Sequence, residues 1–129
     1  MNEENKIKMD HLRISFTELP GVSPQKARIV KFSGHFDEGN EKELEVIYKL
    51  IEEGDHPIFL IFDLDDLKYI NSAGIGRVAD WYTKVTSQNG NVLISNLRPD
   101  IKEVFDLVGI SNLISFFDSN EKAIESLEL

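Results

Sequence analysis

An uninterrupted apolar segment near the middle of the chain, Ile58 to Phe62, constrains the fold more than any other feature. It directly follows Pro57 and has no polar face, so it fits a strand that is covered on both sides. Strands of this kind are typical of parallel sheets that are flanked by helices. We therefore expect residues 58–62 to form the central strand of an α/β domain.

The residues before this strand predict a hairpin. Alternating apolar and polar residues from Leu12 indicate a first strand that ends near Leu19. A turn rich in proline and glycine over 20–24 leads to a second apolar segment, which ends at Gly34. The two strands are expected to pair in antiparallel orientation.

Helix-like patterns alternate with the strands from there on. Apolar residues three and four positions apart predict one helix over 39–53 and another from Ser72 to about residue 89. A strand is expected at 92–95. Pro99 can then begin a third helix that Gly109 ends.

The end of the chain predicts a short edge strand over 113–117 and a last helix, for which Asp118 and Glu121 resemble a capping box. The element order is therefore ββαβαβα(β)α. Because βαβ crossovers are right-handed, it predicts a single α/β domain: a mixed, mostly parallel sheet of four to five strands packed against about four helices. We place this domain at residues 11–129, after a polar tail at 1–10.

The charge balance narrows the class of partner. The chain has 14 Lys and Arg against 23 Asp and Glu, a formal net charge of -9. Such a surface repels nucleic acid phosphates and anionic lipids, so we expect protein partners and no direct contact with nucleic acid or membrane. Cysteine is absent, which excludes disulfides and thiolate nucleophiles. Because no signal-peptide-like segment is present either, we expect a cytoplasmic protein.

Signatures of catalysis and of cofactor binding are missing. His11, His35 and His56 lie in three separate segments without ligand spacing, so no metal site is assigned. The glycines at 74 and 76 match neither common phosphate-loop pattern, and no cofactor is expected. Ser72 has no neighbouring base to activate it. The chain is therefore not expected to be an enzyme.

Three aspartates precede this serine, namely Asp63, Asp65 and Asp66. Such a cluster can bind a divalent cation or act in acid–base chemistry. Aspartate is also common where a strand gives way to a loop, especially in an acidic protein. We favour the interpretation that these three residues lie in a solvated loop.

Ser72 itself has two possible roles at the start of its helix. As the N-cap its hydroxyl would accept a hydrogen bond from the first turn, which is worth about 1 kcal/mol relative to alanine. The same position also suits a phosphate, because the free N–H groups and the helix dipole favour an anion there. An exposed serine at this place can thus be the substrate of another enzyme.

Three segments resemble one family. Residues 63–76, DLDDLKYINSAGIG, are similar to the D-L-S-x-V-x-x-I-D-S-x-G-x-G signature of the STAS domain, which is found in bacterial anti-sigma factor antagonists. Residues 34–37 (GHFD) and 104–110 (VFDLVGI) resemble two further motifs of that family. Together the three matches extend over nearly the whole chain. The resemblance implies a small mixed sheet packed against helices, in agreement with the predicted element order.

The resemblance also implies a partner switch that regulates sigma-factor-dependent transcription. Family antagonists bind an anti-sigma factor that is also a serine kinase, phosphorylation of the serine at the helix start breaks the complex, and a serine phosphatase resets it. The matching acceptor here is Ser72. The implied partner-binding residues are Asp37, Asn71, Ser72, Ala73, Gly74, Ile75, Gly76, Arg77 and Trp81. We expect a monomer or a weak dimer.

Two positions depart from the family pattern. Asn71 stands where the family usually has aspartate, and Ala73 replaces a frequent second hydroxyl residue, so Ser72 is the only acceptor in the motif. Trp81 can be either a core-edge residue or, with Arg77, part of a binding hot spot. Two other functions stay open: a scaffold or subunit of a larger signalling or transport assembly without a phospho-switch, and a small-ligand or nucleotide sensor.

Overall fold

The computed structural model describes residues 11–129, and the predicted tail at 1–10 lies outside the described residues. The predicted order of strands and helices is confirmed, with one added 3₁₀ turn. The elements are β1 (Arg13–Glu18), β2 (Ala27–Phe36), α2 (Glu41–Glu53), β3 (Phe59–Ile70), α3 (Ser72–Ser87), β4 (Asn91–Ser95), α4 (Pro99–Val108), the 3₁₀ turn η1 (Ile110–Asn112), β5 (Phe116–Phe117) and α5 (Asn120–Leu127).

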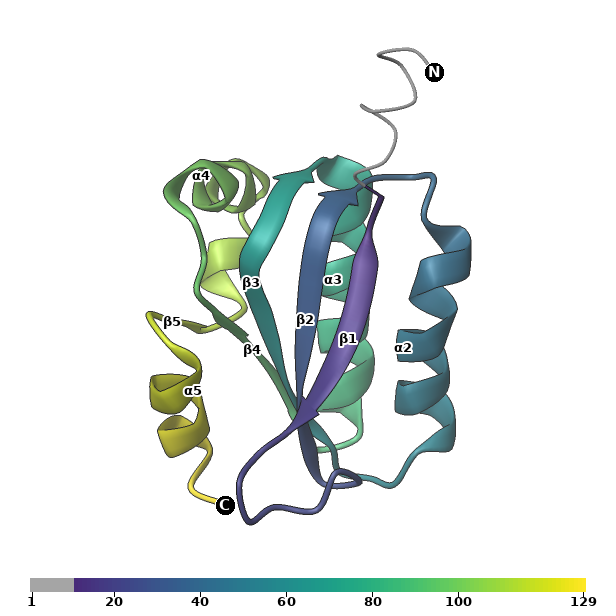
Figure 1. The fold of residues 1–129 in the computed structure, drawn as a ribbon, viewed down its shortest axis with the longest axis vertical. Coiled ribbons are helices and arrows are strands. Elements are labelled where there is room, and N and C mark those ends of the chain that lie inside the picture. The colour runs from purple at the N-terminus through teal and green to yellow at the C-terminus, as the bar shows by residue number, and fades with distance from the viewer. Residues whose placement is uncertain (1–10) are drawn as a thin grey trace, which may run out of the picture.

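The five strands form one sheet in the order β1-β2-β3-β4-β5. β1 pairs with β2 in antiparallel orientation, and the other three pairs are parallel. The predicted hairpin, the mixed sheet and the central position of residues 58–62 are therefore confirmed. Figure 1 shows α3 behind β1 and β2, α2 to the right of the strands, and α4 and α5 to the left.

β3 continues eight residues beyond Phe62, to Ile70. The prediction that Asp63, Asp65 and Asp66 lie in a solvated loop is therefore wrong, since all three are part of this strand. The pairing of β2 with β3 shifts register twice along this stretch, which interrupts the strict alternation of buried and exposed residues. Because of this irregularity, the second half of the strand lacks the alternation from which a strand is predicted.

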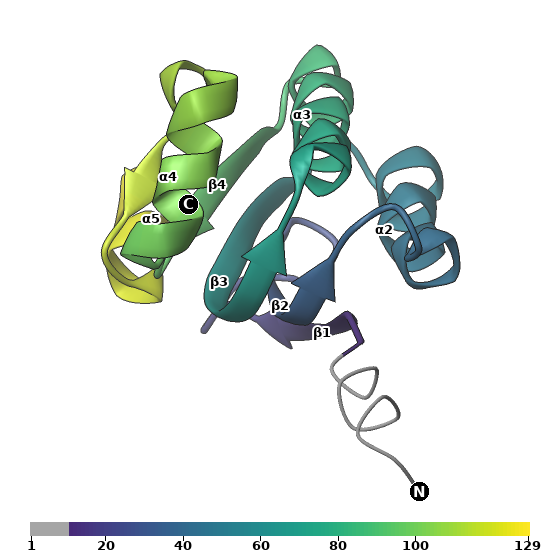
Figure 2. The same cartoon turned by 90° about the horizontal axis from the view of Figure 1, so that it is seen from above.

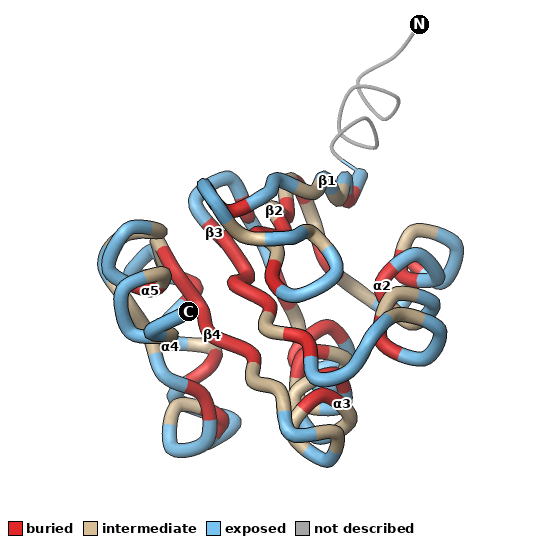
Figure 3. The backbone as a smooth tube through the Cα atoms, turned by 90° about the horizontal axis from the view of Figure 1, so that it is seen from below, coloured by how far each residue is buried: buried red, intermediate tan, exposed pale blue. Residues whose placement is uncertain are grey.

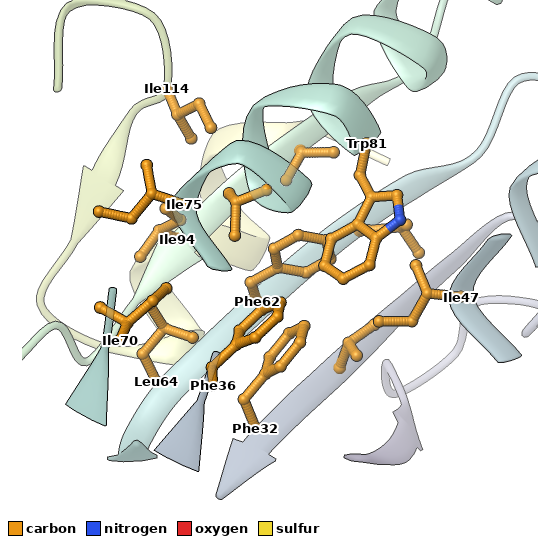
Figure 4. Packing of buried hydrophobic residues seen from close by; sticks show 14 of the residues in the cluster. Phe32, Phe36, Ile47, Phe62, Leu64, Ile70, Ile75, Trp81, Ile94 and Ile114 are labelled. Carbon is orange, nitrogen blue, oxygen red and sulfur yellow. The ribbon is translucent and has the colours of Figure 1, made fainter. Parts of the chain in front are cut away.

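The larger of two apolar cores lies between the sheet and the helices α2, α3 and α4. At its centre are the rings of Phe32, Phe36, Phe62 and Trp81, with centroids 5.1–6.0 Å apart (Figure 4). Aromatic contacts at such distances add to the stability from apolar burial. Viewed from above, α2 and α3 lie on one side of the twisted sheet (Figure 2).

The smaller core lies on the other face, where Ala123 of α5 packs with Ile61 and Leu93. β3 thus alternates, because Leu60 and Phe62 belong to the larger core and Ile61 to the smaller one. Figure 3 shows the resulting band of buried residues along the inner strands. A strand covered on both faces explains the continuous apolar segment in the sequence.

The start of α5 is held by a polar cluster on the same face. Asp63, only 7% exposed, accepts hydrogen bonds from the side-chain amides of Asn96 at 3.0 Å and Asn120 at 3.1 Å. The N-cap of α5 is Ser119, whose hydroxyl accepts from the backbone N–H of Lys122 at 3.1 Å. The predicted capping box of residues 118 and 121 is therefore wrong by one position.

Candidate functional site

The predicted acceptor serine lies where β3 passes into α3. The residue between the two elements, Asn71, has extended backbone angles, and its Oδ1 accepts a hydrogen bond from the N–H of Gly74 at 3.1 Å. Asn71 is therefore the N-cap of α3, and the alternative in which Ser72 caps the helix is wrong. Ser72 is the first residue of the helix and its side chain is exposed.

The first turn of α3 suits an anion better than the corresponding turns of the other helices. α2, α4 and α5 each have acidic residues in their first turn, whereas α3 has none. The positive end of the α3 dipole is thus not balanced by a side chain of its own helix. A negative group on Ser72 would lie at this end of a helix of 16 residues.

The loop between β2 and α2 contacts the N-cap of α3 directly. The backbone N–H of Asn71 donates to the carbonyl oxygen of Phe36, and its side-chain Nδ2 donates to Oε2 of Glu38 at 2.7 Å. The hydrogen bond from Asn71 lowers the pKa of Glu38 below its ordinary value. The sequence pointed to Asp37 in this loop, but Asp37 Oδ1 accepts from the N–H of Gly39 and shapes the loop itself.

The structure places the predicted partner-binding residues on α3, at its N-cap and in the loop before α2, and it divides them by exposure. Ser72, Ala73 and Gly76 are exposed, Asp37, Asn71 and Arg77 are half-buried, and Gly74, Ile75 and Trp81 are buried. Only the first two groups can present side-chain or backbone atoms freely to a docked protein. The buried group holds the surface in place.

Trp81 belongs to the core rather than to a binding surface. Its side chain is 0% exposed and contacts Phe32, Phe36 and Phe62. The prediction that Trp81 is a partner-binding residue is therefore wrong, because α3 turns this position towards the sheet. The alternative that assigned Trp81 to the apolar interior was nearer to the structure.

Arg77 joins α3 to α2. Its Nη2 lies 2.5 Å from Oε1 of Glu41, and its Nη1 donates to the hydroxyl of Tyr48 at 3.2 Å. The Tyr48 hydroxyl donates in turn to Asp80 at 3.0 Å. The guanidinium is thus engaged within the domain and lies on the side of α3 that faces α2.

A shallow apolar groove of about 170 Å³ lies on the other side of the Ser72 turn. Ser72 and Gly76 of α3 line one wall, and Val108 and Leu113 line the other. Val108 is 52% exposed and Leu113 57%, and neighbouring Leu107 reaches 87%. Sequence reasoning missed this wall. The sequence offered one signal beside the wall: Leu107, which does not itself line the groove, is a large apolar residue outside the buried stripe of α4.

Among residues 11–129 no group of three or more His, Asp or Glu residues is arranged to hold a metal ion. No helix among the described residues has both the length and the apolar character needed to cross a membrane.

Comparison with known proteins identifies relatives of this chain. The chain is 27% identical over 96 residues to BtrV of Bordetella bronchiseptica, a candidate anti-sigma factor antagonist, a match that covers 74% of this chain and 81% of BtrV. Its fold is similar to an anti-sigma factor antagonist from Mycobacterium paratuberculosis, with a TM-score of 0.76 and 17% identity over 93% of this chain and 97% of the other.

SpoIIAA, also an anti-sigma factor antagonist, has the same fold. Its unphosphorylated form gives a TM-score of 0.73 with 18% identity over 89% of this chain and 96% of the other, and the phosphorylated form of the Bacillus protein gives 0.66 with 16% identity over 88% and 98%. The murine anion transporter Solute Carrier 26 family member A9 gives 0.73 with 12% identity, over 97% of this chain and 24% of the transporter. The sequence model of the STAS domain matches residues 13–123. The chain therefore belongs to the STAS domain family.

Proposed function

We propose that this protein is an anti-sigma factor antagonist that binds an anti-sigma factor with serine kinase activity and is switched off by phosphorylation of Ser72. The observation that carries the proposal is the position of Ser72, an exposed residue at the start of a helix whose cap is supplied by its neighbour. A serine that does not cap its helix can be modified without loss of the cap. The relative BtrV, a candidate anti-sigma factor antagonist, supports the same function.

The switch would act through charge at the docking surface. A phosphate adds about -1.5 to -2 charges at neutral pH. Within the domain this charge is favoured by the first turn of α3, so the fold tolerates it. At the interface it would face a partner that fits a neutral hydroxyl, and each 1.4 kcal/mol of lost interaction lowers affinity roughly tenfold. Phosphorylation is therefore expected to release the partner without unfolding the antagonist.

The proposed docking surface joins the Ser72 turn to the groove beside it. Ser72, Ala73 and Gly76 provide the exposed part of α3, with Val108 and Leu113 as an adjacent apolar wall. Charge depletion and apolar residues are typical of the centre of a protein interface. The phosphate would stand on the rim of this groove.

The remaining parts of the proposal follow from the switch. A serine phosphatase would restore the unphosphorylated form, and sigma-factor-dependent transcription would be the output. We take residues 11–129 as the domain that binds, acting as a monomer or weak dimer in the cytoplasm. No contact with nucleic acid or membrane is part of the proposal, in keeping with a formal net charge of -9.

The test uses an anti-sigma factor with serine kinase activity, sought among the products of neighbouring genes, with binding measured by calorimetry and phosphorylation by mass spectrometry. The kinase with ATP is expected to add a single phosphate, at Ser72. Ser72→Asp is expected to lose binding, whereas Ser72→Ala keeps binding and takes no phosphate. Equal affinity of the Asp and Ala variants would contradict the switch.

A second function is a STAS subunit of a larger signalling or transport assembly without a phospho-switch. The observation that favours it is the similarity of the fold to part of the murine anion transporter. In that case the full chain would co-purify with a membrane complex, and the Ser72 variants would not differ in this association. Co-purification with a kinase that Ser72→Asp abolishes would exclude this function.

A further inference from the structure

The side chain of Asn71 uses both ends of its amide. The carbonyl oxygen accepts from the N–H of Gly74 at 3.1 Å, and the Nδ2 group donates to the carboxylate of Glu38 at 2.7 Å. One residue thus caps α3 and ties this helix to the loop before α2. Since Asn71 directly precedes Ser72, the two bonds fix the backbone on which the proposed acceptor is presented.

An amide can make both bonds at once, and an ionised carboxylate cannot. An aspartate at position 71 could still accept from the Gly74 N–H, but it has no donor for Glu38. It would instead place two carboxylates in contact, at a distance where like charges repel. The carboxylate of Glu38 therefore determines that asparagine, and not aspartate, fits before Ser72 in this protein.

The loop that holds Glu38 is itself well fixed. The side chain of Asn40, which is 6% exposed, accepts from the backbone N–H of Asp37 at 2.7 Å. Asp37 accepts from the N–H of Gly39 at 2.9 Å, and the carbonyl oxygen of Asn40 accepts the first hydrogen bond of α2, from Leu44. Glu38 thus projects towards α3 from a closed turn.

We infer that Glu38 is a positioning residue for Ser72: its carboxylate orients the side-chain amide of Asn71, which caps α3 and directly precedes the proposed acceptor. The functional half of this inference rests on the proposed function, because it concerns the presentation of Ser72 to a kinase. The structural half concerns the isolated chain and does not depend on any partner.

The experiment is a double-mutant cycle on the full chain. The variants are Glu38→Ala, Asn71→Asp, Glu38→Gln and the combination Asn71→Asp with Glu38→Gln. In the combination the bond is reversed, because the glutamine amide can donate to the new aspartate while that aspartate still accepts from Gly74. The readout is hydrogen exchange of the Gly74 backbone N–H, measured by NMR.

Exchange of the Gly74 N–H is expected to rise roughly 1.5- to 5-fold in Glu38→Ala, the size of effect expected when an exposed side-chain contact is lost. Asn71→Asp should raise it further, and the added Glu38→Gln should return it to near the native rate. If Asn71→Asp leaves the rate unchanged, or if Glu38→Gln does not relieve its effect, the inference is overturned. Glu53→Gln makes the same charge change at the exposed far end of α2 and is expected to leave the rate unchanged.

The functional half is tested by the initial rate at which the anti-sigma kinase of the proposed function phosphorylates Ser72. Glu38→Ala is expected to lower this rate by a similar factor, and the reversed pair to restore it. Equal rates in all variants would overturn the role of Glu38 at Ser72 while leaving phosphorylation itself intact. Failure of the proposed function would look different, since no variant would then accept a phosphate.

Discussion

Gly74 packs against the end of β2 so closely that a Cβ atom at this position would lie 2.9 Å from the carbonyl oxygen of Phe36. The same atom would lie 2.8 Å from Cγ1 of Ile70. Real Cβ atoms do not approach backbone this closely, so only glycine lets the first turn of α3 rest on the strand ends. Gly76, two residues later, has open space around it.

This difference predicts opposite effects for two matched substitutions. Gly74→Ala must displace the start of α3 from β2 and should lower the free energy of unfolding by about 1–3 kcal/mol. Gly76→Ala adds a methyl group that meets no neighbouring atom in a helix interior, so it should raise the free energy of unfolding by about 0.5–1 kcal/mol. Urea unfolding followed by Trp81 fluorescence measures both. Similar effects of the two changes would contradict the close contact at Gly74.

Trp81 is predicted to be a stability residue. Trp81→Ala should lower the free energy of unfolding by about 3–5 kcal/mol, because it empties the centre of the aromatic cluster. Circular dichroism in urea is the suitable measurement, since the variant loses its fluorophore. Leu107→Ala is the control, as this side chain is 87% exposed and should change stability little. A small effect at Trp81 would argue that the residue is not buried.

Asp63 is predicted to hold α5 on the sheet. Asp63→Ala removes the acceptor of the Asn96 and Asn120 amides, and leaving half-buried donors unpaired costs about 1–3 kcal/mol. Amide exchange should rise in α5 more than in α2, which lies on the other face. Asp65→Ala, an exposed change in the same strand, is the control. Uniform exchange changes in both helices would contradict a local role.

The pKa of Glu38 is predicted to depend on Asn71. The hydrogen bond from Asn71 lowers this pKa in the folded state, so Asn71→Ala should raise it towards its ordinary value. A lowered folded pKa contributes stability that is present above the unfolded pKa of glutamate and is lost as the pH falls through the folded pKa. NMR titration of the Glu38 carboxyl measures the shift.

Asp106 provides the control for this titration. Its pKa is lowered by hydrogen bonds from Ser111 and Lys102, which lie away from Asn71. It should therefore titrate identically in the native chain and in Asn71→Ala. An unchanged pKa of Glu38 in this variant would mean that the two side chains are not in contact in solution.

The apolar groove beside Ser72 predicts a residue that matters for binding and not for folding. Leu113→Asp introduces a charge at a side chain that is 57% exposed, so stability should change by less than about 0.5 kcal/mol. Affinity for the anti-sigma kinase should fall at least tenfold, since a charge in the groove must be desolvated on docking. Unchanged affinity in calorimetry would remove the groove from the proposed surface.

Much of the fold could be predicted because local pattern and tertiary environment agree. The segment at 58–62 has apolar residues on both faces, and helices cover the sheet on both faces there. The helices at 41–53, 72–87 and 99–108 follow apolar stripes that face the core. The second half of β3 was not predicted as a strand. Its register shifts against β2 interrupt the alternation of buried and exposed residues.

The candidate site could be predicted from the sequence only in part. Sequence alone determined that a serine opens a helix after an apolar strand, and that no side chain next to it can act as a catalytic base. It could not decide that Asn71 rather than Ser72 caps the helix, nor that Trp81 turns inwards. Both depend on how α3 is oriented against the sheet, where Gly74 lies close to Phe36.

Only the tertiary structure shows that the carboxylate of Glu38 lies beside Asn71, the residue that precedes the proposed acceptor Ser72. Glu38 and Asn71 are 33 positions apart in the chain, and they meet because the parallel strands β2 and β3 end at the same edge of the sheet. Local sequence determines secondary structure through short-range periodicity and capping. Contacts between distant loops depend on strand order and register, so the residue that orients the Ser72 turn could be found only in the folded chain.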